Sequence, residues 1–340
     1  MAARPRPLIV LAGHIHPDGR AQLEAEARVA VATELTEAKV VAAAAEAEGI
    51  LFRGGPRCTE RLMAACPRLR VVGRHGVGLD TVDIPAATRF GIAVVHAPGS
   101  NSQAVAEHTL MLMLACVKRT RQVDRLTRSG DWSARHVVAS TELGGKTLGI
   151  VGVGNVGGRV AKFAGAIGMR VVGYDKYVPD DEVRRRGAEP VPSLEELLPQ
   201  ADVLTCHTPL TPETRHLINE KSLALLKPGA IFINTSRGPV QSEPALFEAL
   251  VTGRLRAAGL DVFEEEPSPL DNPLFNLDNV VCSTHVAGVT QEAHRVAALQ
   301  VTAEMLRVLR GERPHVLVNP EVWPRLASRR GREASTSAPV

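Results

Sequence analysis

Short apolar runs rich in β-branched residues alternate with helical patterns along the first hundred residues. The predicted strands are Leu8–Leu11, Val29–Ala32, Gly49–Phe52, Leu69–Val72 and Ile92–Val95. The predicted helices between the earlier strands are Gly19–Ala27, Thr36–Glu48 and Thr59–Ala65. This alternation predicts βαβ units, and therefore a parallel sheet with helices on both faces. Because no dinucleotide fingerprint occurs in this part, substrate binding is its natural role.

A long helical pattern over Gln103–Arg125 follows the Pro98-Gly99 pair. Its apolar stretch Thr109–Val117 predicts a helix that is buried nearly all round. The segment Ser129–Leu143 then has the length of a functional or interface loop. Its Trp132 is predicted either to contact a second subunit or to lie in the core, and the pattern leaves both open.

A second alternating series begins after this loop. Its predicted strands are Leu148–Val151, Arg170–Tyr174, Asp202–Cys206, Ala230–Asn234, Ala257–Leu260 and Val280–Ser283. Ser193 and Glu196 form a capping box at the start of one intervening helix, and Gly253 ends another, Glu243–Val251. Six strands with helices between them are what a complete dinucleotide-binding fold requires.

Three glycines, Gly152, Gly154 and Gly157, follow the first strand of this series with the spacing G-x-G-x-x-G. Such glycines permit a tight turn, a close approach of the backbone to a pyrophosphate and close packing of the next helix, Val156–Ala166. Free N–H groups and the helix dipole would then face the phosphates. A glycine-rich turn without a ligand is the alternative interpretation of the spacing alone.

An acidic residue, Asp175, ends the next strand, where a carboxylate would accept hydrogen bonds from the adenosine ribose. It favours NAD over NADP, because a carboxylate would repel a 2′-phosphate. The adjacent Lys176 weakens this preference.

The order of segments predicts an α/β protein with two doubly wound parallel-sheet domains. A Rossmann NAD-binding domain, residues 100–285, is inserted into a flavodoxin-like substrate domain made of residues 1–99 and 286–320. The helix Gln291–Leu309 is predicted to cross back to the first sheet, which has no other continuation. Residues 321–340 are predicted to be a disordered tail, because the Ser-, Arg- and Ala-rich end has no periodicity.

The composition adds few constraints. A chain of 340 residues can form two domains, and a net charge of +3 gives no sign of a nucleic-acid or membrane partner. The five cysteines include no C-x-x-C pair, which favours reduced thiols. The N-terminal apolar run is too short for a signal peptide, so we expect a cytoplasmic protein. His14 and His16 lack a third ligand nearby, and we predict a turn there and no metal.

An arginine, a glutamate and a histidine follow successive strands of the second series. These residues are Arg237, Glu266 and His285. Ligands of open parallel sheets lie outside the carboxyl ends of strands, so the three are expected to converge, although each alone is also typical of a surface position. Histidine suits proton transfer, a carboxylate would raise its pKa, and arginine would polarise a carbonyl. Together they predict hydride transfer between a nicotinamide and a small acid.

The chain resembles a known family, the D-isomer-specific 2-hydroxyacid dehydrogenases. Within this family it is most similar to the 3-phosphoglycerate dehydrogenases and the hydroxypyruvate/glyoxylate reductases. The resemblance covers roughly Leu51 to Pro320. The segments that carry it are VGRHGVGLDTVDIPAATRFGIAVVHAPG, SQAVAEHTLMLML, ELGGKTLGIVGVGNVG, HTPLTPETRHLIN, INTSRGPV, AAGLDVFEEEP and THVAGVTQEA.

The resemblance implies roles for individual residues. Arg237 would bind and polarise the substrate, Glu266 would pair with the histidine, and His285 would be the acid/base. The backbone of His75, Gly76, Val77 and Gly78 would cradle the substrate carboxylate, and Arg53 and Arg74 would contact substrate. With the glycine motif and Asp175, the residues implied for NAD are Asn155, Val156, Lys176, His207, Thr208, Pro209, Thr214, Thr235, Ser236, Asp261 (at the carboxamide) and Gly288. The family also implies a homodimer.

The chain departs from the family pattern at three positions. His75 stands where alanine or serine is usual and would alter which substrate fits. Thr284 replaces a proline, and Ser242 an aspartate, without touching the predicted chemistry. No regulatory domain is expected after residue 320, and therefore no serine feedback.

The substrate and two other functions remain open at this stage. Arg53, Arg74 and His75 predict a cationic mouth for a doubly anionic acid such as 3-phosphoglycerate, with solvated surface arginines as the alternative. An NAD(H)-sensing scaffold, like corepressors that resemble this family, is a second hypothesis. Phosphite dehydrogenase-type oxidation is a third, whereas Glu266 disfavours formate oxidation.

Overall fold

Two compact units make up the chain. The computed structural model describes residues 5–327, apart from the side chains of residues 134 and 137. One unit contains the residues up to Asn101 together with those from Val289 onward, and the other is Ser102–Gly288. The second is therefore inserted into the first along the sequence, and each is described below by itself.

The first unit is built on a five-stranded parallel sheet with the order β2-β1-β3-β4-β5. Its strands are β1 (Leu8–Ala12), β2 (Arg28–Val31), β3 (Gly49–Phe52), β4 (Val71–Arg74) and β5 (Ala93–His96). Its helices are α1 (Pro17–Glu26), α2 (Glu37–Ala44), α3 (Glu60–Ala64), α4 (Ile84–Phe90), α13 (Gln291–Arg310) and the short η4 (Pro320–Val322).

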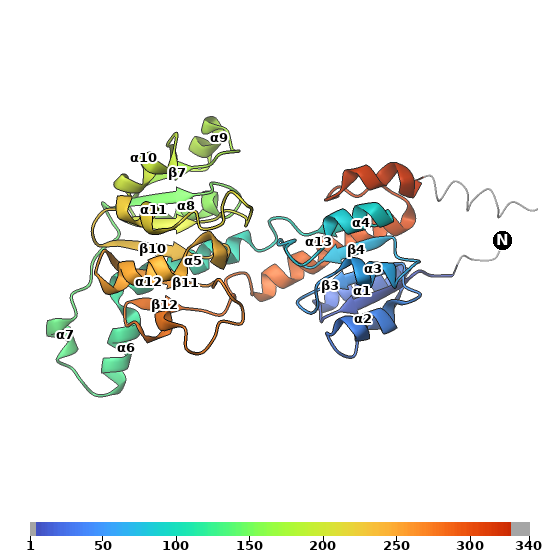
Figure 1. Cartoon of the computed structure of the whole chain (residues 1–340), viewed down its shortest axis with the longest axis horizontal. Helices are drawn as coiled ribbons and strands as arrows, with labels where there is room; N and C mark the ends of the chain where they lie inside the picture. The colour runs from blue at the N-terminus through green and yellow to red at the C-terminus, as the bar shows by residue number, and fades with distance from the viewer. Residues whose placement is uncertain (1–4, 328–340) are drawn as a thin grey trace, which may run out of the picture. The chain divides into compact units, whose positions relative to one another are not determined.

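Alternate strand residues of this sheet face two cores. Val10 and Ala12 of β1 pack with α2, α3 and α4, whereas Ile9 and Leu11 pack with α1 and α13. The helix α13 contacts α1, β4 and β5, which returns the chain to this sheet after the inserted unit (Figure 1). The strand order is that of flavodoxin-like sheets, whose strand order reverses between β1 and β3.

The second unit contains a seven-stranded parallel sheet with the order β12-β11-β10-β9-β6-β7-β8. Its strands are β6 (Thr147–Val151), β7 (Arg170–Tyr174), β8 (Glu189–Pro190), β9 (Val203–Cys206), β10 (Ala230–Asn234), β11 (Leu255–Leu260) and β12 (Val280–Cys282). Reading outward from β6, this is the Rossmann order with one extra strand, and the order reverses between β6 and β9. The predicted fold class is confirmed.

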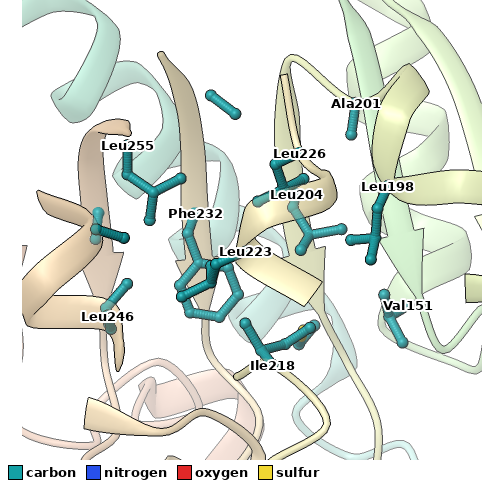
Figure 2. Close-up of a cluster of buried hydrophobic side chains, with 14 of the residues drawn as sticks. Val151, Leu198, Ala201, Leu204, Ile218, Leu223, Leu226, Phe232, Leu246 and Leu255 are labelled. Atoms are coloured by element: carbon teal, nitrogen blue, oxygen red, sulfur yellow. The ribbon is translucent and has the colours of Figure 1, made fainter. Parts of the chain in front are cut away.

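Helices cover both faces of this second sheet (Figure 1). They are α5 (Ser102–Lys118), α6 (Thr120–Arg128), α7 (Ala134–Val137), α8 (Gly157–Ala166), α9 (Asp180–Arg185), α10 (Leu194–Leu197), η1 (Leu198–Gln200), α11 (Glu220–Leu225), η2 (Gly238–Val240), α12 (Glu243–Val251) and η3 (Pro273–Asn276). Figure 2 shows the core on one face, where the buried ring of Phe232 from β10 lies among leucines such as Leu223 and Leu246. The other face packs against α5 and α8.

The prediction of one continuous helix over Gln103–Arg125 is wrong, because the helix is broken at Arg119. That residue has a left-handed φ of 53°, and α6 leaves in a new direction. The guanidinium of Arg121 then donates hydrogen bonds to the carbonyls of Leu277 and Val280, which hold the start of α6 beside β12. The stretch Thr109–Val117 is also not buried all round, since Met111 and Leu114 are exposed.

Helix α4 and strand β8 are among the elements that the sequence analysis did not predict, and part of the predicted tail is wrong. Helix α4 was not predicted, although Asp83 caps its start and Gly91, with φ 70°, ends it. The two-residue strand β8 is too short for a periodic signal. Residues 321–327 are not a disordered tail, since they form a turn and a helix that bury Val322 and Leu326 against the first unit's core. The rest of the predicted tail lies outside the described residues.

Candidate active site

The glycine loop after β6 lies at the point where the strand order of the second sheet reverses. Gly152 has φ 91°, and a Cβ there would lie 2.9 Å from the carbonyl of His207, which follows β9. A Cβ on Gly157 would lie 2.1 Å from the carbonyl oxygen of Gly152, so only glycine lets α8 start so close to the strand. A Cβ on Gly154 would meet nothing within 4 Å, which leaves that side of the loop open.

Backbone donors remain available in this loop. The N–H of Gly152 donates to Tyr174 and that of Val153 to Asp175, but no hydrogen bond among the described residues uses the N–H groups of Gly154, Asn155 or Val156. These three groups precede the N-terminus of α8, where a helix dipole favours an anion. The arrangement fits the pyrophosphate of a dinucleotide.

The carboxylate of Asp175 is held at the end of β7. One oxygen accepts the N–H of Val153 at 2.8 Å, and the other accepts those of Tyr177 and Val178 at 2.9 and 3.0 Å. The neighbouring Lys176 pairs with Glu213 at 2.9 Å, so its charge is largely balanced locally. The charge of Lys176 is therefore a weaker argument against a preference for NAD than the sequence alone suggested.

The segment after β9 has polar atoms that suit a bound ligand. The buried hydroxyl of Thr208 and Nδ1 of His207 have no hydrogen-bond partner in the described part of the chain, which is costly unless a ligand supplies one. Burial lowers the pKa of His207 to about 3, so its ring is neutral at pH 7. The hydroxyl of Thr214 donates to the carbonyl of Pro209 at 2.7 Å and closes this turn.

His285 and Glu266 form a short hydrogen bond, with 2.6 Å between Nδ1 and a carboxylate oxygen. The other carboxylate oxygen accepts the N–H of Phe263 at 3.0 Å, which fixes the carboxylate. The hydrogen bond that His285 donates to Glu266 raises the pKa of His285 above its ordinary value near 6.5, outweighing partial burial. Burial alone would raise the pKa of Glu266, but His285 and the Phe263 N–H together lower it. The pair is therefore suited to hold a proton on the imidazole.

Arg237 follows β10 and approaches this pair through an unusually close backbone contact. A Cβ on Gly238 would lie 1.7 Å from the carbonyl oxygen of Phe263, so glycine is required for the two loops to meet. The charge of Arg237 lowers the pKa of both His285 and Glu266, which places the three groups within electrostatic reach. The three predicted residues are thus brought together in one unit.

The residues just before Arg237 form hydrogen bonds with buried groups. The buried side chain of Asn234 donates to the carbonyl of Arg237 at 2.9 Å and accepts the N–H of Ser236. The hydroxyls of Thr235 and Thr109 lie 2.9 Å apart. This network, which the sequence did not reveal, fixes the backbone that carries the arginine.

Asp261 is more enclosed than its implied contact with the cofactor suggests. Its side chain is fully buried, and it accepts hydrogen bonds from the hydroxyl of Ser283 and the N–H groups of Val286 and Ala287 at 2.6 to 2.9 Å. The Ser283 hydroxyl in turn lies 2.8 Å from Nε2 of His108. These contacts hold the loop that contains His285, whose backbone has a left-handed φ of 56°. A contact with the carboxamide, like the role of Gly288 after this loop, stays a prediction.

In the first unit, the turn after β4 fits the predicted carboxylate cradle except at its first residue. The N–H of His75 donates to the carbonyl of Phe52 at 2.8 Å and is therefore not available to a ligand. No hydrogen bond among the described residues uses the N–H groups of Gly76, Val77 and Gly78, and Gly76 has φ 114°. Such a run of N–H groups is an anion-binding backbone. Arg74 lies beside it and donates to the carbonyl of His75 at 3.0 Å.

The described part of the chain holds neither a cluster of metal ligands nor a helix that could span a membrane. No group of three or more histidine, cysteine, aspartate or glutamate residues is placed to hold a metal ion there. No helix between residues 5 and 327 is long and apolar enough to cross a membrane.

The fold and the glycine loop define a dinucleotide-binding α/β protein. Residues 110–287 match the model of the NAD binding domain of the D-isomer specific 2-hydroxyacid dehydrogenases. The chain is 42% identical over 311 residues to a D-3-phosphoglycerate dehydrogenase of Methanocaldococcus jannaschii, which covers 92% of this chain and 59% of that protein. It is also 42% identical over 261 residues to a glyoxylate reductase of Korarchaeum cryptofilum, with 76% of this chain and 78% of that protein covered.

A solved structure supports the same relationship. The D-lactate dehydrogenase of Aquifex aeolicus, complexed with NAD and lactic acid, superposes with a TM-score of 0.81 at 30% identity, covering 92% of this chain and 99% of that one. The chain therefore belongs to the D-isomer specific 2-hydroxyacid dehydrogenase family, and its nucleotide is NAD. It spans between 57% and 59% of the length of the phosphoglycerate dehydrogenases of M. jannaschii and Mycobacterium tuberculosis that it matches.

Proposed function

We propose that the protein is an NAD-dependent 2-hydroxyacid dehydrogenase that interconverts a small 2-keto acid and its D-2-hydroxy acid. The observation that carries the proposal is the 2.6 Å hydrogen bond between His285 and Glu266, with Arg237 at the end of a nearby strand of the same NAD-binding unit. The roles that follow are the proposal's assignments to the residues of this chain.

His285 is the acid/base. In the direction of reduction, its protonated imidazole gives a proton to the substrate oxygen. The nicotinamide of NADH, held through the glycine loop after β6, would supply the hydride that C2 needs. Glu266 holds the ring through Nδ1, so Nε2 is the nitrogen that exchanges the proton with substrate. Glu266 remains ionised throughout, because its pKa is lowered and a charged carboxylate stabilises the imidazolium.

Arg237 stabilises charge on the substrate oxygen. The planar fork of its guanidinium can bind a carbonyl and a carboxylate oxygen together. Because the backbone of residues 234–237 is held by Asn234, little reorganisation accompanies the reaction. The N–H groups of Gly76, Val77 and Gly78 are assigned to the substrate carboxylate.

The substrate is proposed to carry a second anionic group, such as the phosphate of 3-phosphoglycerate. Arg53, Arg74 and His75 cluster at the carboxyl ends of β3 and β4. In the described part of the chain, the hydrogen-bond partners of the Arg53 guanidinium are the carbonyl of His14 and the ring of His294, and no carboxylate pairs with it. A guanidinium that no described carboxylate balances, such as that of Arg53, favours an anion, whereas His75 adds no charge at pH 7 because its pKa is lowered to about 4.

The test is NADH oxidation with hydroxypyruvate, phosphohydroxypyruvate, glyoxylate, pyruvate and sulfopyruvate, with the reverse reaction run on the D-hydroxy acids. Turnover of at least one keto acid, abolished in His285→Ala, is the expected result. If NADH binds tightly and no keto acid is reduced, the proposal is wrong, and an NAD(H)-sensing scaffold takes its place.

We also propose that the protein acts as a homodimer through the region of α6 and α7. No residue of α6 is buried, and the indole of Trp132 in the following turn is 73% exposed. A large exposed aromatic side chain on a protruding segment is typical of an interface. Light scattering should give a dimer for the native chain and a shift toward monomer in Trp132→Ala. A native monomer at assay concentrations would contradict the proposal.

A further inference from the structure

Arg53 of the first unit is held between a backbone carbonyl and a histidine from the last long helix. One terminal nitrogen of its guanidinium donates to the carbonyl of His14 at 2.7 Å, and the other lies 2.9 Å from Nε2 of His294. His294 lies in the first turn of α13, 241 residues further along the chain. The sequence offered no signal for this contact, because only the return of α13 to the first sheet creates it.

A second histidine holds the first. His75 is 7% exposed, its Nε2 lies 3.3 Å from the carbonyl oxygen of His294, and the two rings meet edge to face with 5.7 Å between their centroids. Burial, followed by the charge of Arg53, lowers the pKa of His75 to about 4 and also lowers that of His294. Both rings are therefore neutral at pH 7, and a neutral His294 can accept a hydrogen bond from the Arg53 guanidinium.

Among residues 5–327, no carboxylate forms an ion pair with Arg53. The carboxylate of Asp18, near the start of α1, pairs with Arg295 at 2.6 Å and lies 3.7 Å from His16. A guanidinium has five N–H donors, and the two contacts described above use one on each terminal nitrogen. The other donors remain for a ligand.

The cluster also lies where the strand order of the first sheet reverses. Gly13 follows β1, and a Cβ there would lie 2.3 Å from the carbonyl oxygen of Arg53, which follows β3. Ligands of open parallel sheets bind at such a reversal, outside the carboxyl ends of the strands.

We propose that His294 is a positioning residue that selects doubly anionic substrates, by fixing the guanidinium of Arg53 for a phosphate, sulfonate or second carboxylate. This inference rests on the proposed dehydrogenase function. A long arginine side chain has many rotamers, and an immobilised one binds an anion without first losing that freedom. His75 supports this arrangement through its contacts with the backbone carbonyl and the ring of His294.

The experiment compares hydroxypyruvate with its phosphate monoester, two keto acids that differ only in the second anion. In His294→Ala, we expect KM for the phosphate ester to rise about tenfold, as for loss of a hydrogen bond to a charged group, while kcat stays within about twofold. KM for hydroxypyruvate should change by less than about twofold. His294→Gln should restore most of the affinity, because an amide oxygen can accept the same hydrogen bond.

Two controls distinguish positioning from a general effect. Arg53→Ala should lose the preference for the ester, and adding His294→Ala to it should change nothing further, since the two residues act through one contact. Arg295→Ala removes a neighbouring positive charge that is paired with Asp18, and it should not discriminate between the substrates beyond about twofold.

Other outcomes would overturn the inference. Equal changes for both keto acids in His294→Ala, or additive effects of the Arg53 and His294 substitutions, would show that His294 does not act through Arg53. Activity on hydroxypyruvate without any preference for the ester would refute the selectivity and leave the proposed function intact. Failure to reduce any keto acid would instead refute the proposed function.

Discussion

The two parallel sheets place their candidate ligand sites at the same topological point but provide different chemistry there. In the second unit, a glycine loop lies at the reversal between β6 and β9. The N–H groups of Gly154, Asn155 and Val156 in this loop donate to no other described residue. In the first unit, the reversal between β1 and β3 is lined by Arg53, held by His294. In both, a glycine with positive φ lets neighbouring loops touch, namely Gly152 against His207 and Gly13 against Arg53.

This comparison separates what the architecture requires from what the ligand requires. Within each unit, the two neighbouring loops at the reversal pack so closely that glycine is required there, whatever ligand binds. Beyond that, a pyrophosphate can be bound by backbone donors alone, whereas a choice among small acids needs side chains of defined charge and position. The predictions below test this division.

The largest difference between the units should come from removing the acid/base of the second. His285→Ala is expected to lower kcat for keto acid reduction about 1,000-fold, the usual contribution of a positioned acid/base, with NADH affinity unchanged. Steady-state kinetics and fluorescence titration of NADH measure the two quantities. A loss of less than tenfold would mean that another group transfers the proton.

The second prediction breaks the glycine loop without touching the first unit. Gly157→Ala would force a Cβ to within 2.1 Å of the Gly152 carbonyl oxygen, and we expect NADH affinity to fall about 100-fold as α8 moves away. Gly165→Ala is the matched control on the same helix, because a Cβ there meets nothing within 4 Å. It should bind NADH normally and be slightly more stable to heat. Equal NADH affinities of the two variants would refute this account of the loop.

The reciprocal experiment is Gly13→Ala, which would place a Cβ 2.3 Å from the Arg53 carbonyl oxygen at a φ of 121°. We expect roughly 1–3 kcal/mol lower stability and weaker binding of doubly anionic keto acids, with unchanged NADH affinity. Thermal denaturation, KM values and NADH titration measure these effects. A large loss of NADH affinity would contradict the division between the two sites.

The third effect is a change of pH dependence. Glu266 raises the pKa of His285, and reduction requires the protonated ring, so activity falls as pH rises through that pKa. Glu266→Gln removes the charge, so the fall should occur at lower pH, with about tenfold lower kcat/KM at slightly alkaline pH. Oxidation of the hydroxy acid needs the neutral ring, and its rise should also begin at lower pH. pH profiles in both directions that match the native ones would exclude this role for Glu266.

The smallest effect concerns the nucleotide. Asp175→Asn keeps one acceptor oxygen for the backbone N–H groups but removes the charge, and we expect the preference for NAD over NADP to fall about five- to tenfold. Lys176→Ala should act in the opposite direction, but weakly, because Glu213 already balances that charge. Ratios of kcat/KM for the two nucleotides would test this, and an unchanged ratio in Asp175→Asn would assign selectivity to other residues.

The sequence by itself determined the parts whose physics is local. Apolar periodicity gave the strand and helix order, and G-x-G-x-x-G followed by Asp175 predicted the nucleotide loop, because turn, dipole and strand end all lie within a short segment. The position of Arg237, Glu266 and His285 after successive strands sufficed to predict that they converge, since parallel strands share one carboxyl edge. Helix α4 also has local signals at both ends, the Asp83 cap and the terminal Gly91, although it is not among the predicted helices.

Only the tertiary structure decided features that depend on distant segments. The contact of Gly238 with Phe263, the buried hydrogen bonds of Asp261 and the use of the His75 N–H by Phe52 all join separate loops. The hydrogen bond between Arg53 and His294 forms because α13 packs on a sheet that ended some 200 residues earlier in the chain. No local pattern encodes such a contact, because its partners become neighbours only when the hydrophobic face of a helix is buried against its sheet.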